Sequence, residues 1–431
     1  MTTTTAPAAP AALDALRAQV AAARAASPAL AVATSAEKNA ALAAIADGLR
    51  ARRDDVVAAN ARDVAKAEAD GLDAAAIDRI RLDAGRVEAL AGSLSAVIAL
   101  PDPVGETIDS AVRPNGLEIG RVRVPLGVIA AIYENRPNVT IDIAALCLKS
   151  GNACVLRGGR EALESNRVLA AIIAGGLDDA GLPGDAVQFI ANTDRALVGA
   201  LLEMHDLIDL MIPRGGKGLV ERVRDEASMP VVAGGIGICH TYVDRSADLG
   251  MALEIVDNAK TRRVSICNAL DVMILHADVA GPFLASLAER WGERVELRAD
   301  PASAALLAGT PARVRPAGPD DFDTEFLDMV AGVRVVDAPE AALAHIAAHG
   351  SGHSEAIVTS DDALAERFLH EVDAATVYVN ASTQFTDGGE FGLGAEVGIS
   401  TGKLHARGPV GLRELTSYKW VVRGTGQTRP R

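Results

Sequence analysis

The chain has 431 residues, of which 49% are hydrophobic and 23% charged, and its formal net charge at pH 7 is −15. This length predicts about three domains, and the composition is that of a globular protein with more than one buried core. An acidic surface repels phosphate backbones and anionic lipid, so we expect no nucleic-acid or membrane partner. The negative net charge does not exclude a local basic pocket for one phosphorylated ligand. The sequence holds no apolar run of the roughly 20 residues that a membrane-spanning helix requires.

The N-terminus and the cysteines indicate the compartment. Residues 1–10 are rich in Thr, Ala and Pro, lack the pattern of a secretory signal, and are expected to form a disordered tail. Four cysteines are too few for a disulfide framework in a chain of this length. No two of them have metal-ligand spacing near a histidine, so we predict no metal site. We therefore expect a reduced, cytoplasmic protein.

Residues 11 to about 100 are predicted to be helical. Apolar residues recur at helical spacing, for example at Leu42, Ile45 and Leu49. Thr34 and Glu37 have the spacing of a capping box, which predicts that a helix begins directly after Thr34.

Residues 101–124 predict an exposed β-ribbon. Apolar and polar residues alternate there around the turn signal Pro114-Asn115-Gly116. Because an exposed ribbon normally needs a partner strand, we expect it to pair with residues 409–423 and to act in oligomerisation.

From residue 125 short apolar strands alternate with helices. The predicted strands are 128–133, 153–156, 187–190, 207–212 and 230–233, and the predicted helices are 141–149, 161–180, 195–204 and 218–226. A second α/β unit follows, with helices 249–259, 281–291 and 341–349 and strands 272–275 and 356–359. This alternation is typical of parallel sheets with right-handed crossovers, as in doubly wound nucleotide-binding domains.

These elements predict an α/β fold with two domains and a ribbon. Residues 11–100 and 125–243 would form the doubly wound cofactor domain, and residues 244–380 the second α/β domain. Residues 381–408 would return the chain to the cofactor domain.

Cys267 is the candidate nucleophile. It lies in a predicted loop close in sequence to Lys260, Arg262 and Arg263. Nearby cations lower the pKa of a thiol and favour the nucleophilic thiolate. A lone cysteine can equally be a small buried hydrophobic residue, and this interpretation fits Cys147, Cys154 and Cys239 better.

Two loops that follow predicted strands combine paired glycines with cations. One reads Arg157-Gly158-Gly159-Arg160 and the other Arg214-Gly215-Gly216-Lys217. Glycines at a helix N-terminus let backbone N–H groups approach a phosphate. Neither loop is a GxGxxG motif or a P-loop, and both could be ordinary connections. Two such loops in an acidic chain nevertheless favour a phosphorylated dinucleotide, with Arg157 or Arg160 near its 2′-phosphate.

Longer motifs extend these observations over nearly the whole chain. They include VPLGVIAAIYENRPNVT, VLRGGRE, MIPRGGKGL, VVAGGIGICHTYVD, TEFL, SGHSEAIVT and VNASTQFTDGGEFGLGAEVGISTGKLHARGPVGLRELTSYKW. From about residue 11 to about residue 423 the sequence closely resembles the gamma-glutamyl phosphate reductase family, a branch of the aldehyde dehydrogenase superfamily. The resemblance implies an aldehyde-dehydrogenase-like fold.

The resemblance also implies roles for individual residues. It makes Cys267 the nucleophile and Asn135 an oxyanion donor. The family often has a smaller residue in place of Asn135, so the backbone N–H of Cys267 is the other candidate donor. Arg136 and Arg263 are candidates for binding the substrate's carboxylate or phosphate. The implied cofactor-binding residues are Arg157, Gly158, Gly159, Glu161, Pro213, Arg214, Gly215, Gly216 and Glu325.

The implied reaction is the NADPH-dependent reduction of L-glutamyl 5-phosphate to L-glutamate 5-semialdehyde and phosphate, through a cysteine thioester, as the second step of proline synthesis from glutamate. The implied partners are further copies of the chain and, functionally, glutamate 5-kinase.

One difference from hydrolytic aldehyde dehydrogenases helps to distinguish this reaction from other possible functions. Those enzymes carry a Glu just before a Gly-Gly pair, where it activates water, whereas this chain reads Val231-Val232-Ala233-Gly234-Gly235. A thioester that reacts with phosphate needs no such base. The alternatives are a CoA-acylating or hydrolytic aldehyde dehydrogenase and, in another class, a non-catalytic nucleotide-binding scaffold.

Overall fold

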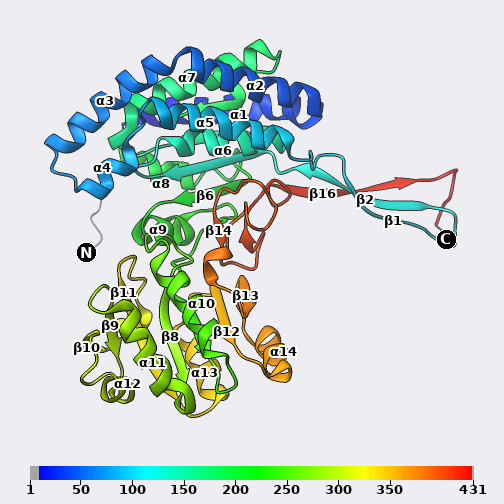
Figure 1. Cartoon of the computed structure of the whole chain (residues 1–431). Helices are drawn as coiled ribbons and strands as arrows, with labels where there is room; N and C mark the ends of the chain where they lie inside the picture. Colours follow the sequence, from blue (N-terminus) through cyan, green and yellow to red (C-terminus); the bar gives the residue numbers. More distant parts are fainter. Residues whose placement is uncertain (1–8, 430–431) are drawn as a thin grey trace. The chain divides into compact units, whose positions relative to one another are not determined.

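The computed structural model describes residues 9–429, which form two compact units (Figure 1). The first unit comprises Met1–Ala233, Gly392–Gly398 and Val410–Arg431, and the second comprises Gly234–Phe391 and Ile399–Pro409. Most of the predicted tail lies outside the described residues, but Pro10 already begins helix α1 (Pro10–Val32). The predicted return segment 381–408 is divided between the units, with 392–398 in the first.

The first unit is built on a parallel sheet with strand order β5-β4-β3-β6. Its strands are β3 (Val128–Tyr133), β4 (Ala153–Arg157), β5 (Val187–Phe189) and β6 (Leu210–Arg214). β3 and β4 are buried along their whole length, which explains their continuous apolar runs. After β3, the chain adds β4 and then β5 on one side of β3, and it later places β6 on the other side of β3. The strand order therefore reverses between β3 and β6. The predicted doubly wound arrangement is confirmed.

Helices cover this sheet, some above it and others below it in the view of Figure 1. They are α1, α2 (Ser35–Ala51), α3 (Arg53–Ala69), α4 (Ala74–Ile80), α5 (Ala84–Ala99), α6 (Asn138–Lys149), α7 (Leu163–Asp179), α8 (Ala196–Leu202) and α9 (Lys217–Glu226). The predicted capping box is confirmed at α2. The Glu37 amide donates to Thr34 Oγ1 at 3.2 Å, and the Thr34 amide donates to Glu37 Oε2 at 2.7 Å.

The predicted ribbon is an antiparallel three-stranded sheet that extends away from the helices of the first unit (Figure 1). It consists of β1 (Thr107–Val112), β2 (Glu118–Pro125) and β16 (Thr416–Arg423). Gly116 has φ +82°, as the predicted turn requires. β16 pairs with all of β2, from Thr416 opposite Pro125 to Arg423 opposite Glu118, which confirms the expected pairing of the two segments.

The second unit contains a seven-stranded sheet with order β10-β9-β11-β8-β7-β12-β13, in which every described pair is parallel. Its strands are β7 (Cys239–Val243), β8 (Leu270–His276), β9 (Glu296–Ala299), β10 (Arg313–Pro316), β11 (Val330–Val336), β12 (Ser354–Val358) and β13 (Thr376–Val379). A short antiparallel pair, β14 (Ile399–Ser400) and β15 (Gly408–Pro409), also belongs to this unit.

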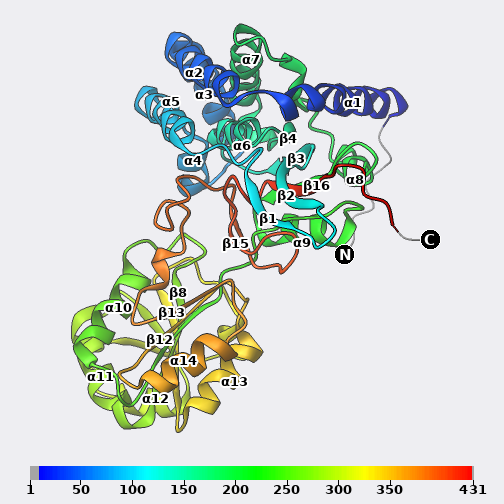
Figure 2. The same cartoon turned by 90° about the vertical axis from the view of Figure 1, so that its right-hand side faces the viewer.

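Helices cover both faces of the large sheet (Figure 2). They are α10 (Leu249–Thr261), α11 (Ala277–Trp291), α12 (Pro301–Leu306), α13 (Pro339–His349) and α14 (Asp362–Glu371). α10 and α11 contribute to one apolar core, and α13 and α14 to a second core. Within the described residues, no helix is both long enough and apolar enough to cross a membrane.

One strand prediction is wrong. Residues 230–233 do not form a strand, and Val231 makes a single isolated bridge to Met211 of β6. Pro230 has no N–H to donate, and Gly234 and Gly235 follow closely, so the ladder stops after two hydrogen bonds.

Candidate active site

The sheet of the first unit brings most of the predicted cofactor residues to one edge. β3, β4 and β6 are parallel, so the loops that follow them meet where the strands end at their carboxyl termini. This edge, at the point where strand order reverses, is the usual binding place for a nucleotide in an open α/β sheet. The predicted residues found there are Asn135, Arg136, Arg157, Gly158, Gly159, Glu161, Pro213, Arg214, Gly215 and Gly216.

Glu134 connects the loops after β3 and β6. The amide of Gly216 donates to Glu134 Oε2 at 2.9 Å, and the Glu134 amide donates to the carbonyl of Arg214 at 3.0 Å. A Cβ on Gly215 would lie 2.4 Å from Glu134 Oε2, so a larger residue there would displace this carboxylate from its bond to Gly216. The next residue, Asn135, adopts a left-handed backbone conformation with φ 45°.

The two glycines after β4 also lie close to neighbouring side chains. A Cβ on Gly158 would lie 2.2 Å from Asn166 Nδ2, and one on Gly159 would lie 2.6 Å from Glu161 Oε2. Asn166 is itself fixed, because Thr140 Oγ1 donates to its Oδ1 at 2.8 Å. The backbone of this loop is therefore held close to α7.

The two arginines of this loop differ in position. Arg157 is buried, and its guanidinium donates to the carbonyls of Asp194 at 3.0 Å and Thr193 at 3.4 Å. It thereby ties the end of β4 to the loop after β5. Arg160 is exposed and pairs with Glu161 at 3.2 Å. Of the two cations that the sequence proposed for a 2′-phosphate, Arg160 is the one that solvent reaches.

In the second unit, Cys267 lies on a turn between α10 and β8. Its side chain is partly exposed, whereas Cys147, Cys154 and Cys239 are buried. Buried hydrogen bonds fix the following residue: Asn268 Nδ2 donates to the carbonyls of Thr386 and Gln384, and Thr383 Oγ1 donates to the Asn268 carbonyl at 2.7 Å. The turn that carries the candidate nucleophile is therefore anchored to the segment around residues 383–386.

The segment before β7 packs against the same turn. A Cβ on Gly237 would lie 1.6 Å from the carbonyl oxygen of Cys267. The Gly237 amide donates to Glu325 Oε1 at 3.0 Å, and burial raises the pKa of this carboxyl. The structure thus brings Glu325, a predicted cofactor residue, into the same cluster as Cys267. Arg263 is exposed, and its carbonyl accepts from Gln384 Nε2 at 3.2 Å.

Lys260, one of the three cations close in sequence to Cys267, is buried. Its Nζ donates to the carbonyl of Leu270 at 2.9 Å and lies 3.9 Å from Asp271 Oδ1. Burial lowers the pKa of Lys260 and raises the pKa of Asp271 to about 7. The sequence showed Lys260 only as a positive charge near Cys267 and did not show that it lies close to Asp271.

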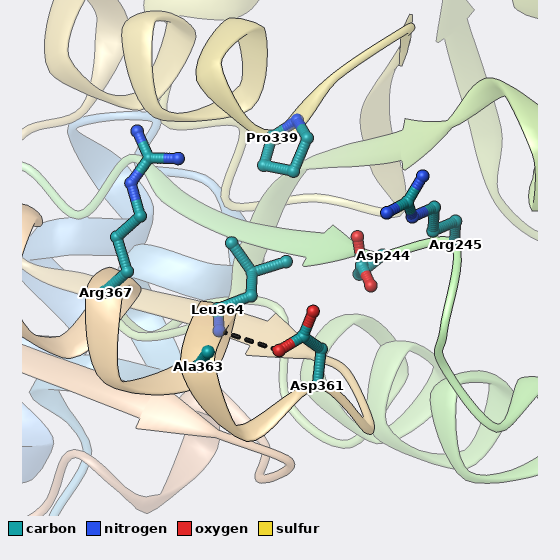
Figure 3. A pocket seen from close by; sticks show the side chains of 7 residues that line it. All are labelled: Asp244, Arg245, Pro339, Asp361, Ala363, Leu364 and Arg367. Carbon is teal, nitrogen blue, oxygen red and sulfur yellow. Dashed lines mark hydrogen bonds between the residues drawn. The ribbon is translucent and has the colours of Figure 1, made fainter.

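A cavity of about 250 Å³ lies elsewhere in the second unit (Figure 3). It follows the carboxyl ends of β7 and β12, whereas Cys267 precedes β8 at the amino edge of the same parallel sheet. The cavity therefore lies at the opposite edge from the candidate nucleophile. Its lining residues are Asp244, Arg245, Pro339, Asp361, Ala363, Leu364 and Arg367.

Comparisons with known proteins decide the family. The aldehyde dehydrogenase family matches residues 2–304. The gamma-glutamyl phosphate reductase of Dehalococcoides mccartyi strain CBDB1 is 54% identical over 409 residues, which cover 94% of this chain and 96% of that protein. The chain belongs to the gamma-glutamyl phosphate reductase family. The protein of that name from Rhizorhabdus wittichii is 54% identical over 410 residues, covering 95% of this chain and 94% of the relative.

Solved structures of the gamma-glutamyl phosphate reductase family agree with the fold. The crystal structure of the Thermotoga maritima protein matches with a TM-score of 0.94 and 45% identity, over 96% of this chain and 100% of that chain. The glyceraldehyde-3-phosphate dehydrogenase of Methanocaldococcus jannaschii, solved with NADP, has a TM-score of 0.65 at 15% identity and shows the shared fold alone. The family resemblance and the aldehyde-dehydrogenase-like fold inferred from the sequence are confirmed.

Three residues of these clusters were not identified from the sequence. Glu134 stood in a motif without an assigned role, Gly237 was one glycine in a Gly-rich stretch, and Cys239 was interpreted as structural only. The contacts that distinguish them link distant positions, such as Glu134 with Gly216, which no local pattern reveals.

Proposed function

We propose that this protein reduces L-glutamyl 5-phosphate to L-glutamate 5-semialdehyde and phosphate, as the second step of proline synthesis from glutamate. The observation that carries the proposal is the partly exposed thiol of Cys267, on an anchored turn, in a chain that is 54% identical to proteins named for this activity. The reaction is biosynthetic, and we place it in the cytoplasm.

Cys267 would act as the nucleophile. Its thiolate attacks the acyl carbonyl of L-glutamyl 5-phosphate, the C–S bond forms, and the C–O bond to phosphate breaks, leaving a thioester. The backbone N–H of Cys267, with Asn135 as a second candidate, would donate to the oxyanion of the tetrahedral intermediate. The phosphate leaves readily, so the step needs little help from a general acid.

The residues at the sheet edge of the first unit fit a phosphorylated dinucleotide. Paired glycines follow β4 and β6, and each loop carries an exposed cation, Arg160 or Lys217. NADPH, when bound, supplies the hydride that reduces the acyl group. We propose that Arg160 binds the 2′-phosphate and that Arg157 positions the adjoining loops. By the family resemblance, Pro213, Arg214, Gly215 and Gly216 would cover the pyrophosphate, with Glu161 and Glu325 at the two riboses.

Two exposed arginines are candidates for the anionic groups of the substrate. Arg136 follows β3, and Arg263 lies four residues before Cys267. We propose that they bind the carboxylate or phosphate of L-glutamyl 5-phosphate, since guanidinium groups bind both anions in a bidentate manner.

The ribbon supplies a surface for a second copy of the chain. Apolar side chains of β1 and β16 are exposed, including Val112, Trp420 and Val422. An exposed apolar strand surface of this kind normally becomes covered. We propose that it forms part of a homo-oligomer interface, and that the enzyme works in sequence with glutamate 5-kinase.

The reverse assay tests the function. L-glutamate 5-semialdehyde is incubated with phosphate and either NADP or NAD, for the wild type and Cys267→Ala. We expect phosphate-dependent reduction of NADP by the wild type and none by the variant. Activity that needs CoA in place of phosphate would support an acylating aldehyde dehydrogenase instead. Activity without either acceptor would indicate a hydrolytic enzyme, and unchanged turnover in Cys267→Ala would remove the proposed nucleophile.

A further inference from the structure

We propose that Cys239 is a positioning residue for Cys267: its thiol holds the backbone carbonyl of the nucleophile and so fixes the direction of the attacking sulfur. The inference rests on the proposed function in one respect, namely that Cys267 is the nucleophile. Cys239 touches neither substrate nor cofactor in this scheme and acts only through Cys267.

The contact is a part-buried hydrogen bond between the start of β7 and the turn that precedes β8. Cys239 is the first residue of β7, is fully buried, and donates from Sγ to the Cys267 carbonyl oxygen at 3.3 Å. Burial, followed by the nearby carboxylates of Glu355 and Asp271, raises the pKa of the Cys239 thiol. The thiol therefore keeps its proton at neutral pH and remains a donor.

Gly237 bounds the same carbonyl group from another direction. Its missing side chain is essential, because a Cβ would lie 1.6 Å from the Cys267 carbonyl oxygen and 2.5 Å from the carbonyl carbon. Gly237 is itself held by the bond from its amide to Glu325. The Cys267 carbonyl therefore has two neighbours from the start of β7 and the segment before it. Cys239 supplies a hydrogen-bond donor, and Gly237 supplies a close backbone contact.

Together these contacts restrain the backbone of the nucleophile. The carbonyl of Cys267 belongs to the peptide group that it shares with Asn268, and Asn268 is fixed by Thr383, Gln384 and Thr386. With that peptide group held, the Cα of Cys267 is held as well, which limits the positions that Sγ can reach by rotation about the Cα–Cβ bond. Misplacement of a reacting atom by about 1 Å can cost a factor of about a hundred in rate.

The competing interpretation is that Cys239 only fills space, as small buried thiols often do. Three variants separate the two. Cys239→Ala removes the donor, Cys239→Ser keeps a donor at the same position, and Cys154→Ala removes an equally buried thiol from β4 in the first unit. For each we would measure kcat, KM, thermal stability, and the pH dependence of Cys267 alkylation by iodoacetamide.

We expect Cys239→Ala to lower kcat about ten- to a hundred-fold with KM changed less than about three-fold, and to shift the pH midpoint of Cys267 alkylation. Cys239→Ser should recover most of kcat, and Cys154→Ala should lower only the melting temperature. Wild-type kcat and alkylation in Cys239→Ala, or equal defects in the Ser and Ala variants, would overturn the proposal. Alkylation needs no substrate, so it tests the positioning even if the wild type fails to act on L-glutamyl 5-phosphate.

Discussion

The Gly216 amide and the Glu134 carboxylate, 82 residues apart in the chain, are joined by a hydrogen bond of 2.9 Å. The bond links the loops after β6 and β3, which flank the reversal of strand order in the first unit. It fixes the backbone of one paired-glycine loop by means of a side chain from another loop.

Replacement of Glu134 should loosen the loop after β6. We expect Glu134→Ala to raise the Kd for NADPH about three- to ten-fold, because a hydrogen bond to a charged group contributes about 1.5–3 kcal/mol and part of this orders the loop. Glu134→Gln keeps an acceptor oxygen and should have a smaller effect. Quenching of protein fluorescence during NADPH titration measures both. Asp225→Ala, which removes another exposed carboxylate of α9, is the control, and an unchanged Kd in Glu134→Ala would contradict this role.

Arg160 and Arg157 should affect the cofactor differently. Arg160 is exposed, so Arg160→Ala should raise the Kd for NADPH about ten-fold and leave the Kd for NADH unchanged. Arg157 is buried on backbone carbonyls, so Arg157→Ala should lower the melting temperature and weaken both cofactors alike. Parallel titrations with the two cofactors measure the difference. If Arg160→Ala weakened NADH and NADPH equally, Arg160 would not recognise the 2′-phosphate.

Two adjacent glycines of α7 should respond in opposite directions to the same substitution. A Cβ on the buried Gly176 would lie 2.6 Å from Ile45 Cγ1 and 2.8 Å from the Ile45 amide nitrogen, whereas one on the exposed Gly175 would meet nothing within 4 Å. We expect Gly176→Ala to lower the free energy of unfolding by about 1–3 kcal/mol through overpacking. Gly175→Ala should raise it by about 0.5–1 kcal/mol, because alanine loses less entropy in a helix. Urea denaturation of both variants checks the signs, and a stable Gly176→Ala would mean that α2 and α7 can separate easily.

Asp142 on α6 should make stability depend on pH. Burial raises its pKa to about 6, against the opposing effects of the hydrogen bond from Asn138 and the charge of Arg214. A carboxyl whose pKa is higher in the folded protein than in the unfolded chain binds its proton more tightly when folded. Its contribution to the free energy of unfolding is therefore full at low pH and is lost as the pH rises from about 4 through about 6.

The variant Asp142→Asn lacks this titration but keeps an oxygen that can accept from Asn138. The melting temperature of the wild type minus that of Asp142→Asn should therefore fall between about pH 4 and pH 6.5 and stay level above that range. Thermal unfolding followed by circular dichroism at several pH values gives the difference. A difference that does not vary with pH would show that the carboxyl is not perturbed.

Local sequence patterns predicted most elements of the first unit, because strands that are buried on both faces appear in the sequence as continuous apolar runs. The continuous apolar runs at residues 128–133 and 153–156 predicted β3 and β4 almost to the residue. In the second unit the strands β9, β10, β11 and β13 were missed. β9, β10 and β13 are short and contain charged or partly exposed residues, and β11 has Gly332 and Arg334 within its apolar run. β6 was predicted three residues too early, because the apolar residues at 207 and 208 lie in the turn before it.

By itself the sequence determined the α/β alternation, the ribbon and its partner strand, the paired-glycine loops, the candidate nucleophile and the family. These properties depend on local spacing of residue types or on long matching motifs. Only the tertiary structure decided which arginine after β4 is exposed, which carboxylate holds the Gly216 amide, and which thiol meets the Cys267 carbonyl. The physical reason is that hydrogen bonding and close packing act at about 3 Å between atoms, and the order of strands, not distance along the chain, sets which residues come that close.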